Sequence, residues 1–218
     1  MITRAATRRR LLSAGERLIA EYGVTAVSAR RIAEEADAGN HSAVAYHFGT
    51  KQELIVEVVR NHRTEIDRIG ADMAKKASES DDPREHLACV LLPTIIYLAK
   101  LEPPTYYARF VSQVLSDPSS DQHILPELVG PYTGPAMLAI KRLTTHIPAG
   151  IMKSRWRLVR PLMFQASASF EIRVAEGHSP RDDWDFMGRF VLDAVGGLLF
   201  APSTMRAEEL ARFDLSDA

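Results

Sequence analysis

The chain has 218 residues, of which 46% are hydrophobic and 25% are charged, and its formal net charge at pH 7 is −1. Enough apolar residues are present to bury a core and Cys89 is the only cysteine, so the composition excludes a disordered chain and a disulfide-stapled mini-protein. The near-zero net charge excludes a polycation that coats nucleic acid along its whole length, so any nucleic-acid site must be local.

Helical periodicity predicts three helices in the first fifty residues. The first helix runs roughly from residue 5 to residue 22 and ends before Gly23, the residue type expected just beyond a helix C-terminus. Ser28 offers an N-cap for a second helix, Ala29 to Ala36, and a short turn leads to a third helix, His41 to Phe48. The apolar residues predicted to face inward from the two short helices are Ile32, Ala33, Ala36, Val44 and Phe48.

Thr50 and Glu53 match the capping box and predict a long fourth helix, which extends to about residue 75 before the acidic, serine-rich segment 78–82. Further helices punctuated by proline are predicted at about residues 84–101, 104–116, 126–146 (interrupted near Gly130-Pro131 and Gly134-Pro135), 154–176 and 181–200. No segment alternates like a β-strand. We therefore predict an all-α chain of about nine helices, with a three-helix domain at residues 1–50 and a helical bundle at residues 51–218.

Two short helices joined by a turn and braced by a longer preceding helix are typical of the helix-turn-helix motif, whose second helix enters the DNA major groove. Residues 1–51 contain eight Lys and Arg residues against five Asp and Glu residues, so the predicted motif is locally basic. The same pattern of helices occurs in proteins that bind no nucleic acid. The predicted third helix presents small polar and aromatic side chains suited to base edges and phosphates: Asn40, His41, Ser42, Ala45, Tyr46 and His47.

Three segments within residues 8 to 60 carry a recognisable pattern. They are the helix end at Tyr22-Gly23, the second-helix segment 28–36, and the stretch Val44-Ala-Tyr-His-Phe-Gly-Thr-Lys-Gln-Glu-Leu54. In these segments the chain resembles the N-terminal domain of TetR-family transcriptional regulators. The resemblance implies that Ser28 bonds a phosphate and that Arg30 reaches into the major groove. It further implies that Asn40, His41, Ser42 and Ala45 face the bases and that Tyr46, His47 and Lys51 clamp phosphates.

Two features depart from the family pattern. The turn before the third helix is one residue longer, which shifts Gly39 and Asn40 by a position, and Ala45 stands where family members commonly have a tyrosine. His47 also has a second interpretation, because a histidine beside the core residue Phe48 can simply bond a neighbouring carbonyl. Both roles of His47 stay open at this point.

The last two long predicted helices carry apolar residues at helical spacing, which fits either a core or a dimer interface. The resemblance implies that these helices pair with their symmetry mates as a four-helix bundle, so that a homodimer reads a palindromic operator. The stripes are Trp156, Val159, Met163, Ala166, Phe170 and Val174 in one helix, and Phe186, Met187, Phe190, Val191, Ala194, Val195, Leu198 and Leu199 in the other. The small residues that would allow close approach are Ala166, Ala168, Ala194, Gly196 and Gly197.

Aromatic and methionine residues in the bundle are candidates for an inducer pocket, which the resemblance implies; taken alone, they are more typical of an ordinary core than of a pocket wall. The candidates are Tyr97, Tyr107, Phe110, Gln113, Met137, Met163 and Phe164.

The chain contains no nucleophile elbow, phosphate-binding loop, dinucleotide fingerprint or zinc-protease motif, so we expect no enzyme, no metal and no cofactor. It also contains no stretch of about 18 consecutive apolar residues and no signal peptide, so we expect a cytoplasmic protein with no membrane partner. Cys89 lies in an apolar stretch and is interpreted as a buried thiol, with a redox sensor as the alternative.

The sequence therefore predicts a homodimeric DNA-binding transcriptional regulator, specifically a repressor that a small, largely apolar inducer releases from its operator. The alternative is a helical bundle that binds a small molecule and does not bind DNA.

Overall fold

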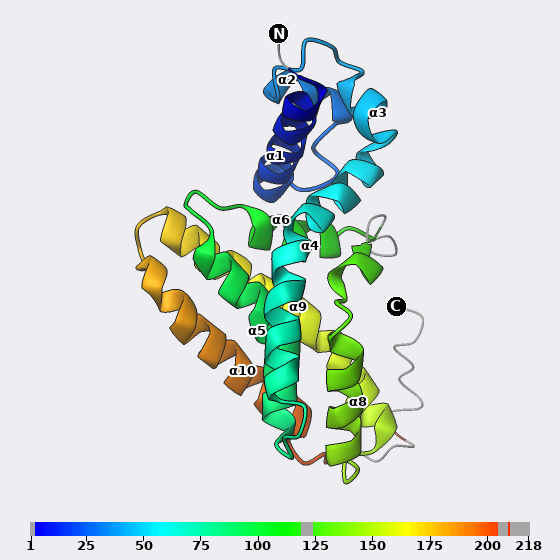
Figure 1. Cartoon of the computed structure of the whole chain (residues 1–218), viewed down its shortest axis with the longest axis vertical. Helices are drawn as coiled ribbons and strands as arrows, with labels where there is room; N and C mark the ends of the chain where they lie inside the picture. Colours follow the sequence, from blue (N-terminus) through cyan, green and yellow to red (C-terminus); the bar gives the residue numbers. More distant parts are fainter. Residues whose placement is uncertain (1–2, 119–123, 205–208, 210–218) are drawn as a thin grey trace.

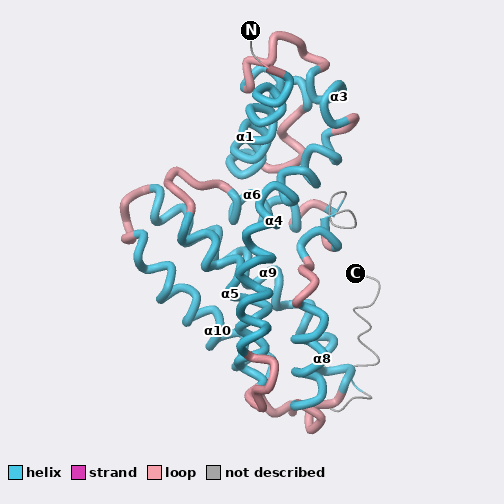
Figure 2. The backbone as a smooth tube through the Cα atoms, in the orientation of Figure 1, coloured by secondary structure: helices cyan, strands magenta, loops and turns pink. Residues whose placement is uncertain are grey.

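The computed structural model of the chain describes residues 3–118, 124–204 and 209, and within these residues it contains helices and loops but no strand (Figure 1, Figure 2). The predicted all-α fold is confirmed for this part of the chain. Residues 3–50 form a small head at one end of an elongated molecule, and the remaining helices form a bundle (Figure 1). None of the described helices is long and apolar enough to cross a membrane.

The head consists of α1 (Arg4–Tyr22), α2 (Ala29–Glu35) and α3 (Ala43–Phe48). Gly23 follows α1 with a φ of +82°, and the Ser28 side chain accepts a hydrogen bond from the Arg31 N–H at the start of α2. α3 begins two residues later than predicted, because the Asn40 side chain accepts a 2.8 Å hydrogen bond from the Ser42 N–H and holds this segment as a turn. The five apolar residues predicted to face inward from α2 and α3 are all buried.

α4 (Lys51–Lys76) starts in the head and continues through the bundle (Figure 1). The predicted capping box is present, because the Thr50 hydroxyl accepts from the Glu53 N–H at 3.0 Å and the Glu53 carboxylate accepts from the Thr50 N–H at 2.8 Å. The apolar stripe of α4 is buried between α1 and α5: Leu54, Ile55, Val58, Val59, Ile66 and Ile69.

The bundle contains α5 (Pro83–Lys100), α6 (Tyr107–Leu115), η1 (Pro126–Leu128), α8 (Thr133–Leu143), α9 (Ala149–Ala175), η2 (Arg181–Asp183) and α10 (Trp184–Phe200). The interruption predicted near Gly130-Pro131 is present, because the chain breaks between η1 and α8. The predicted interruption at Gly134-Pro135 is wrong. Pro135 lies in the first turn of α8, where its missing N–H costs no intrahelical hydrogen bond.

A buried carboxylate joins α9 to the start of α6. The Glu171 side chain, with 1% of the residue exposed, accepts hydrogen bonds from the N–H groups of Ala108 and Arg109 at 3.3 and 3.1 Å. Arg109 Nε donates to the same carboxylate at 3.2 Å. Glu171 thereby satisfies N–H groups that have no partner within α6 and fixes α6 on α9.

Gly70 marks the closest approach between α4 and the segment that precedes α8. A Cβ atom at this position would lie 2.3 Å from Cε1 and Cζ of Tyr132, a buried residue. Only a residue without a side chain therefore allows Tyr132 to pack on α4.

We expect Gly70→Ala to lower the free energy of unfolding by about 1–3 kcal/mol, because the new methyl group displaces a buried ring. Urea or thermal unfolding measures the effect. Gly134→Ala in α8 is the control, since nothing lies within 4 Å of a Cβ there and alanine favours the helix. Equal destabilisation by both substitutions would contradict the proposed contact.

Candidate nucleic-acid interface

The outward surface of α3 and the turn before it consists of exposed residues, here called the α3 surface: Asn40, His41, Ser42, Ala45 and Tyr46. Val44 and Phe48 are buried on the opposite side of the same helix, which packs on α2 and α4. Five predicted DNA-contacting residues are thus brought onto one face. Their hydroxyl, amide, imidazole and methyl groups are of the kinds that contact base edges and phosphates.

The turn between α2 and α3 is braced from α1. Asp37 has a φ of +45° and Gly39 a φ of +69°, so two residues of this longer turn adopt the left-handed conformation. Arg10 donates a 2.8 Å hydrogen bond to the Asp37 carbonyl and forms a 3.0 Å ion pair with its carboxylate. The contacts between Arg10 and Asp37 therefore tie the turn before α3 to α1.

Arg30 and His41 share one carboxylate on the same side of the head. Arg30 Nε donates a 2.8 Å hydrogen bond to Glu34, and His41 Nδ1 lies 3.5 Å from the same oxygen. The hydrogen bond from Arg30 lowers the pKa of Glu34, so this carboxylate is ionised at neutral pH. A phosphate or base that binds Arg30 must compete with Glu34.

Tyr46 is 68% exposed, and the guanidinium of Arg4 lies 5.4 Å from the centre of its ring. Arg4 was not among the predicted site residues, although the basic run at the N-terminus was the signal for it. Ser28 lies at the start of α2, where its side-chain oxygen accepts a hydrogen bond from the Arg31 N–H. Its hydroxyl hydrogen is therefore available for a phosphate.

His47 is half-buried between aromatic and basic side chains. Burial lowers the pKa of His47, and the positive charges of Arg4 and Arg8 lower it further. The imidazole is therefore neutral at pH 7. A phosphate contact from His47 would be a single neutral hydrogen bond and not an ion pair.

Lys51 holds the loop between α1 and α2. Its ammonium donates hydrogen bonds of 2.9 and 3.0 Å to the carbonyls of Val24 and Val27. The structure thus assigns Lys51 two backbone partners within the head, whereas the resemblance implied a phosphate.

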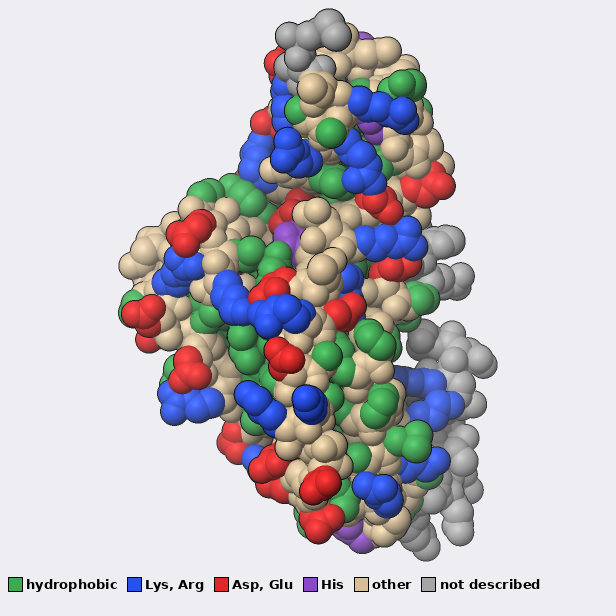
Figure 3. Space-filling model, in the orientation of Figure 1, with side chains coloured by type: hydrophobic (Ala, Val, Ile, Leu, Met, Phe, Trp, Pro, Cys, Tyr) green, Lys and Arg blue, Asp and Glu red, His purple; other side chains and the backbone are tan. Residues whose placement is uncertain are grey.

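Lys and Arg side chains gather over the head on the face shown in Figure 3. Several of them are already paired, because Arg17 binds Glu21 and Glu35 and Arg10 binds Asp37. The positive surface available to DNA is therefore smaller than the predicted excess of basic residues suggests.

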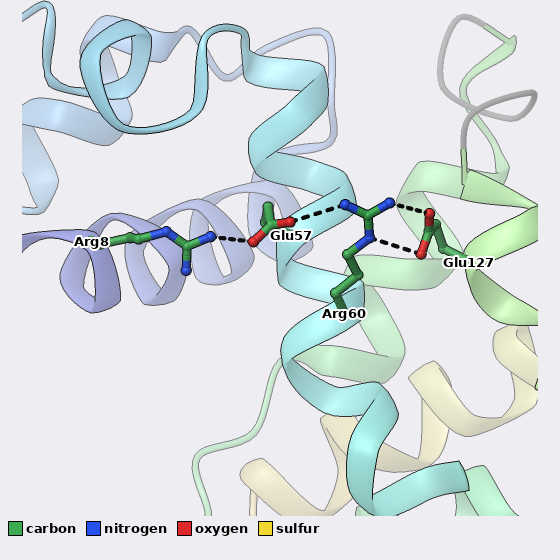
Figure 4. Close-up of polar contacts among 4 residues, drawn as sticks. All are labelled: Arg8, Glu57, Arg60 and Glu127. Carbon is green, nitrogen blue, oxygen red and sulfur yellow. Dashed lines mark hydrogen bonds and ion pairs between the residues drawn. The ribbon is translucent and has the colours of Figure 1, made fainter. Parts of the chain in front are cut away.

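A chain of ion pairs connects the head to the bundle (Figure 4). Arg8 of α1 contacts Glu57 of α4, Arg60 donates to Glu57 at 3.1 Å, and Arg60 also donates to Glu127 of η1 at 2.6 and 3.0 Å. Burial raises the pKa of Glu57, but the hydrogen bonds from Arg60 and Arg8 outweigh it, so the pKa is lowered. The Glu57 carboxylate is therefore ionised at neutral pH.

The bundle contains a cavity of about 610 Å³ that is partly open to solvent, a size typical of small-molecule sites. Of the predicted pocket residues, Tyr107, Met137, Met163 and Phe164 line this cavity. Tyr97, Phe110 and Gln113 do not line it: the Tyr97 hydroxyl lies 2.6 Å from His62 Nδ1, Phe110 is fully buried in the core, and Gln113 is exposed beside Gly23.

His62 links a wall of the cavity to α1. Its ring stacks on Tyr107 with the centroids 4.0 Å apart, and its Nε2 lies 3.1 Å from the Glu16 carboxylate. Tyr107 lines the cavity, so one histidine touches both the cavity wall and the head.

Cys89 is 2% exposed, and its thiol donates to the Glu85 carbonyl at 3.3 Å. Burial raises the pKa of this thiol, which disfavours the reactive thiolate and agrees with the buried-thiol interpretation. Among the described residues, no group of three His, Cys, Asp or Glu side chains is placed to hold a metal ion.

The model of the family of bacterial regulatory proteins, tetR family, matches residues 11–58. The matched residues include α2, α3, the capping box and Glu57 of the ion-pair chain, whereas Arg60 lies just beyond the match. No curated protein matches the chain.

We expect Lys51→Met to lower the free energy of unfolding by about 1–2 kcal/mol, because two backbone carbonyls lose a charged donor. The dependence of duplex-DNA affinity on salt should stay unchanged, whereas loss of a phosphate contact would reduce its slope by about 1. Lys76→Met, at the exposed end of the same helix, is the control. A reduced salt slope with unchanged stability would restore the phosphate role.

Proposed function

We propose a repressor that a small molecule releases from DNA, on the premise that the chain belongs to the tetR family of bacterial regulatory proteins and is a DNA-binding transcriptional regulator. In this proposal the protein acts in the cytoplasm, on double-stranded DNA, and is not an enzyme. The supporting observation is the α3 surface, which lies within the matched segment and is exposed opposite a buried face.

The proposed roles are assigned to the two domains predicted from the sequence. Residues 1–50 bind DNA, with α3 in the major groove and Arg30 entering from α2. Residues 51–218 bind the ligand and form the homodimer. Arg4 joins the proposed contacts because it lies against Tyr46, the most exposed aromatic residue of the α3 surface.

An exposed apolar stripe on α10 supports the homodimer. Phe186 and Phe190 are 62% and 57% exposed, and Ala194 and Gly197 continue the same face as exposed small residues. Their spacing of four, four and three residues keeps them on one side of the helix. A face of this kind buries its apolar area when it meets a copy of itself around a two-fold axis.

The stripe predicted on α9 needs correction, since most of it packs inward. Val159, Met163 and Phe170 are buried, and Trp156 lines the cavity. The exposed apolar residues of α9 are instead Leu158, Leu162 and Ile172, which we propose as its contribution to the dimer. A two-fold dimer places two heads about one DNA turn apart, ~34–36 Å, and so reads a palindrome.

Two connections support release of DNA by a ligand in the cavity. Leu125 and Leu128 line the cavity on either side of Glu127, which ends the ion-pair chain that begins at Arg8. Tyr107 lines the cavity and stacks on His62, which contacts Glu16 of α1. A ligand that displaces these walls shifts α1 and α4 together, and with them the spacing of the two heads.

Selection of duplexes from a random DNA pool at fixed salt tests the proposal. We expect the wild-type protein to enrich a palindrome. Arg30→Ala and Tyr46→Ala should each bind it about tenfold or more weakly, because each removes a base or phosphate contact.

Lys76→Ala is the control for this selection, since it removes an exposed charge far from the α3 surface. A folded dimer that enriches no sequence would overturn the regulator and favour the alternative, a ligand-binding bundle that does not bind DNA.

We expect Phe186→Glu combined with Phe190→Glu to convert the dimer to monomers, because four charges would meet across the two-fold axis. Sedimentation velocity measures the mass, and affinity for the selected palindrome should fall with it. Leu138→Glu, which alters an apolar residue that is 70% exposed on α8, is the matched control. A dimer that persists in the double variant would contradict this interface.

A further inference from the structure

Three basic residues of α9 line one wall of the bundle cavity: Lys153, Arg157 and Arg160, here called the basic wall. Their spacing of four and three residues places them along a single face of the helix. Arg63 from α4 also lines the cavity. The lining residues therefore include four cations, and none of them is an Asp or a Glu.

The charges of the basic wall are incompletely balanced. Arg63 is satisfied, because it pairs with Asp67 and donates a 3.2 Å hydrogen bond to the Leu128 carbonyl, and Arg160 makes a contact of its own. Within the described part of the chain, the side chains of Lys153 and Arg157 form no hydrogen bond or ion pair. Two cations thus face the cavity with no carboxylate on its walls.

The rest of the cavity is mostly apolar. Tyr107 and Trp156 contribute aromatic rings, and only Thr94, Thr133 and Tyr132 add further neutral polar groups. Phe164 adds another aromatic ring. The aliphatic and sulfur-containing residues that line the cavity are Ile66, Val90, Leu91, Leu115, Leu125, Leu128, Val129, Met137, Val159, Pro161 and Met163.

We propose that the cavity binds an amphipathic anion, a molecule with an apolar body and a carboxylate or phosphate group. The apolar body lies against the hydrophobic walls, and the anionic group accepts hydrogen bonds from Arg157 and Lys153. This inference rests on the proposed function and specifies the chemical class of its ligand.

The electrostatics disfavour the other ligand classes. A neutral apolar ligand would remove water from the half-buried Arg157 and return no hydrogen bond, and a cationic ligand would add repulsion. An anion would instead accept hydrogen bonds from these cations and be attracted to them, because neighbouring positive charges on the wall create a positive potential in the cavity. The planar guanidinium of Arg157 further matches two oxygens of a carboxylate or phosphate.

Four probes with the same ten-carbon chain test the proposal by calorimetric titration: decanoate, decyl phosphate, decanol and decylammonium. Fluorescence locates the bound probe, because Trp156 lines the cavity whereas Trp184 packs on Phe170 with ring centroids 4.7 Å apart. We expect at least one anion to bind about tenfold or more tightly than decanol, with a change in emission, and decylammonium to bind weakest. The two anions distinguish a carboxylate site from a phosphate site.

Lys153→Gln combined with Arg157→Gln should abolish the preference for the anion and leave decanol binding unchanged. The matched control is Lys141→Gln with Arg142→Gln, which removes one exposed Lys and one exposed Arg from the end of α8, outside the cavity lining.

Decanol binding as tightly as both anions, no binding of either anion, or an unchanged preference in the Lys153/Arg157 double variant would each overturn the inference. Affinity for the selected palindrome, measured without probes, reports on the proposed function separately. If the anions bind as expected but the protein enriches no DNA sequence, the proposed anion site stands and the proposed repressor function is refuted.

Discussion

The continuity of α4 is the constraint on which the rest of the structure depends. The reciprocal hydrogen bonds between Thr50 and Glu53 fix the residue at which this helix begins, directly after α3. Leu54 and Val58 then pack in the head region, and Ile66 and its successors pack in the bundle. Because a helix transmits rotation and translation along its length, the orientation of α3 follows from the packing of a helix that also borders the cavity.

The ion-pair chain has a different role from the core that surrounds it. Arg60 and Arg8 are largely accessible to water, so their pairs with Glu57 and Glu127 contribute little to the free energy of unfolding. Their value lies in position, because they connect η1, which borders the cavity, to α4 and α1 through charged side chains at the surface. A link of this kind can rearrange at small cost, which suits a switch whose coupling energy is itself small.

Local signals were predictable from the sequence and long-range contacts were not. Ser28, Gly23 and the capping box mark helix ends through bonds to residues a few positions away, so sequence patterns carry them. The engagement of Lys51 by the loop before α2, and of Glu171 by the start of α6, depends on elements distant in sequence. The periodicity of α9 likewise gives a stripe without saying which partner, core or symmetry mate, the stripe meets.

α9 connects the two halves of the proposed regulation, because it has two distinct faces. Val159, Met163 and the basic wall line the cavity, and Leu158 with Leu162 forms the exposed face proposed for the dimer. Since both faces belong to one helix, an anion that shifts α9 through the basic wall would also shift the face proposed for the dimer. In the proposed dimer, a ligand would thereby act on the spacing of the two heads twice, once through α4 within each subunit and once through α9 between subunits.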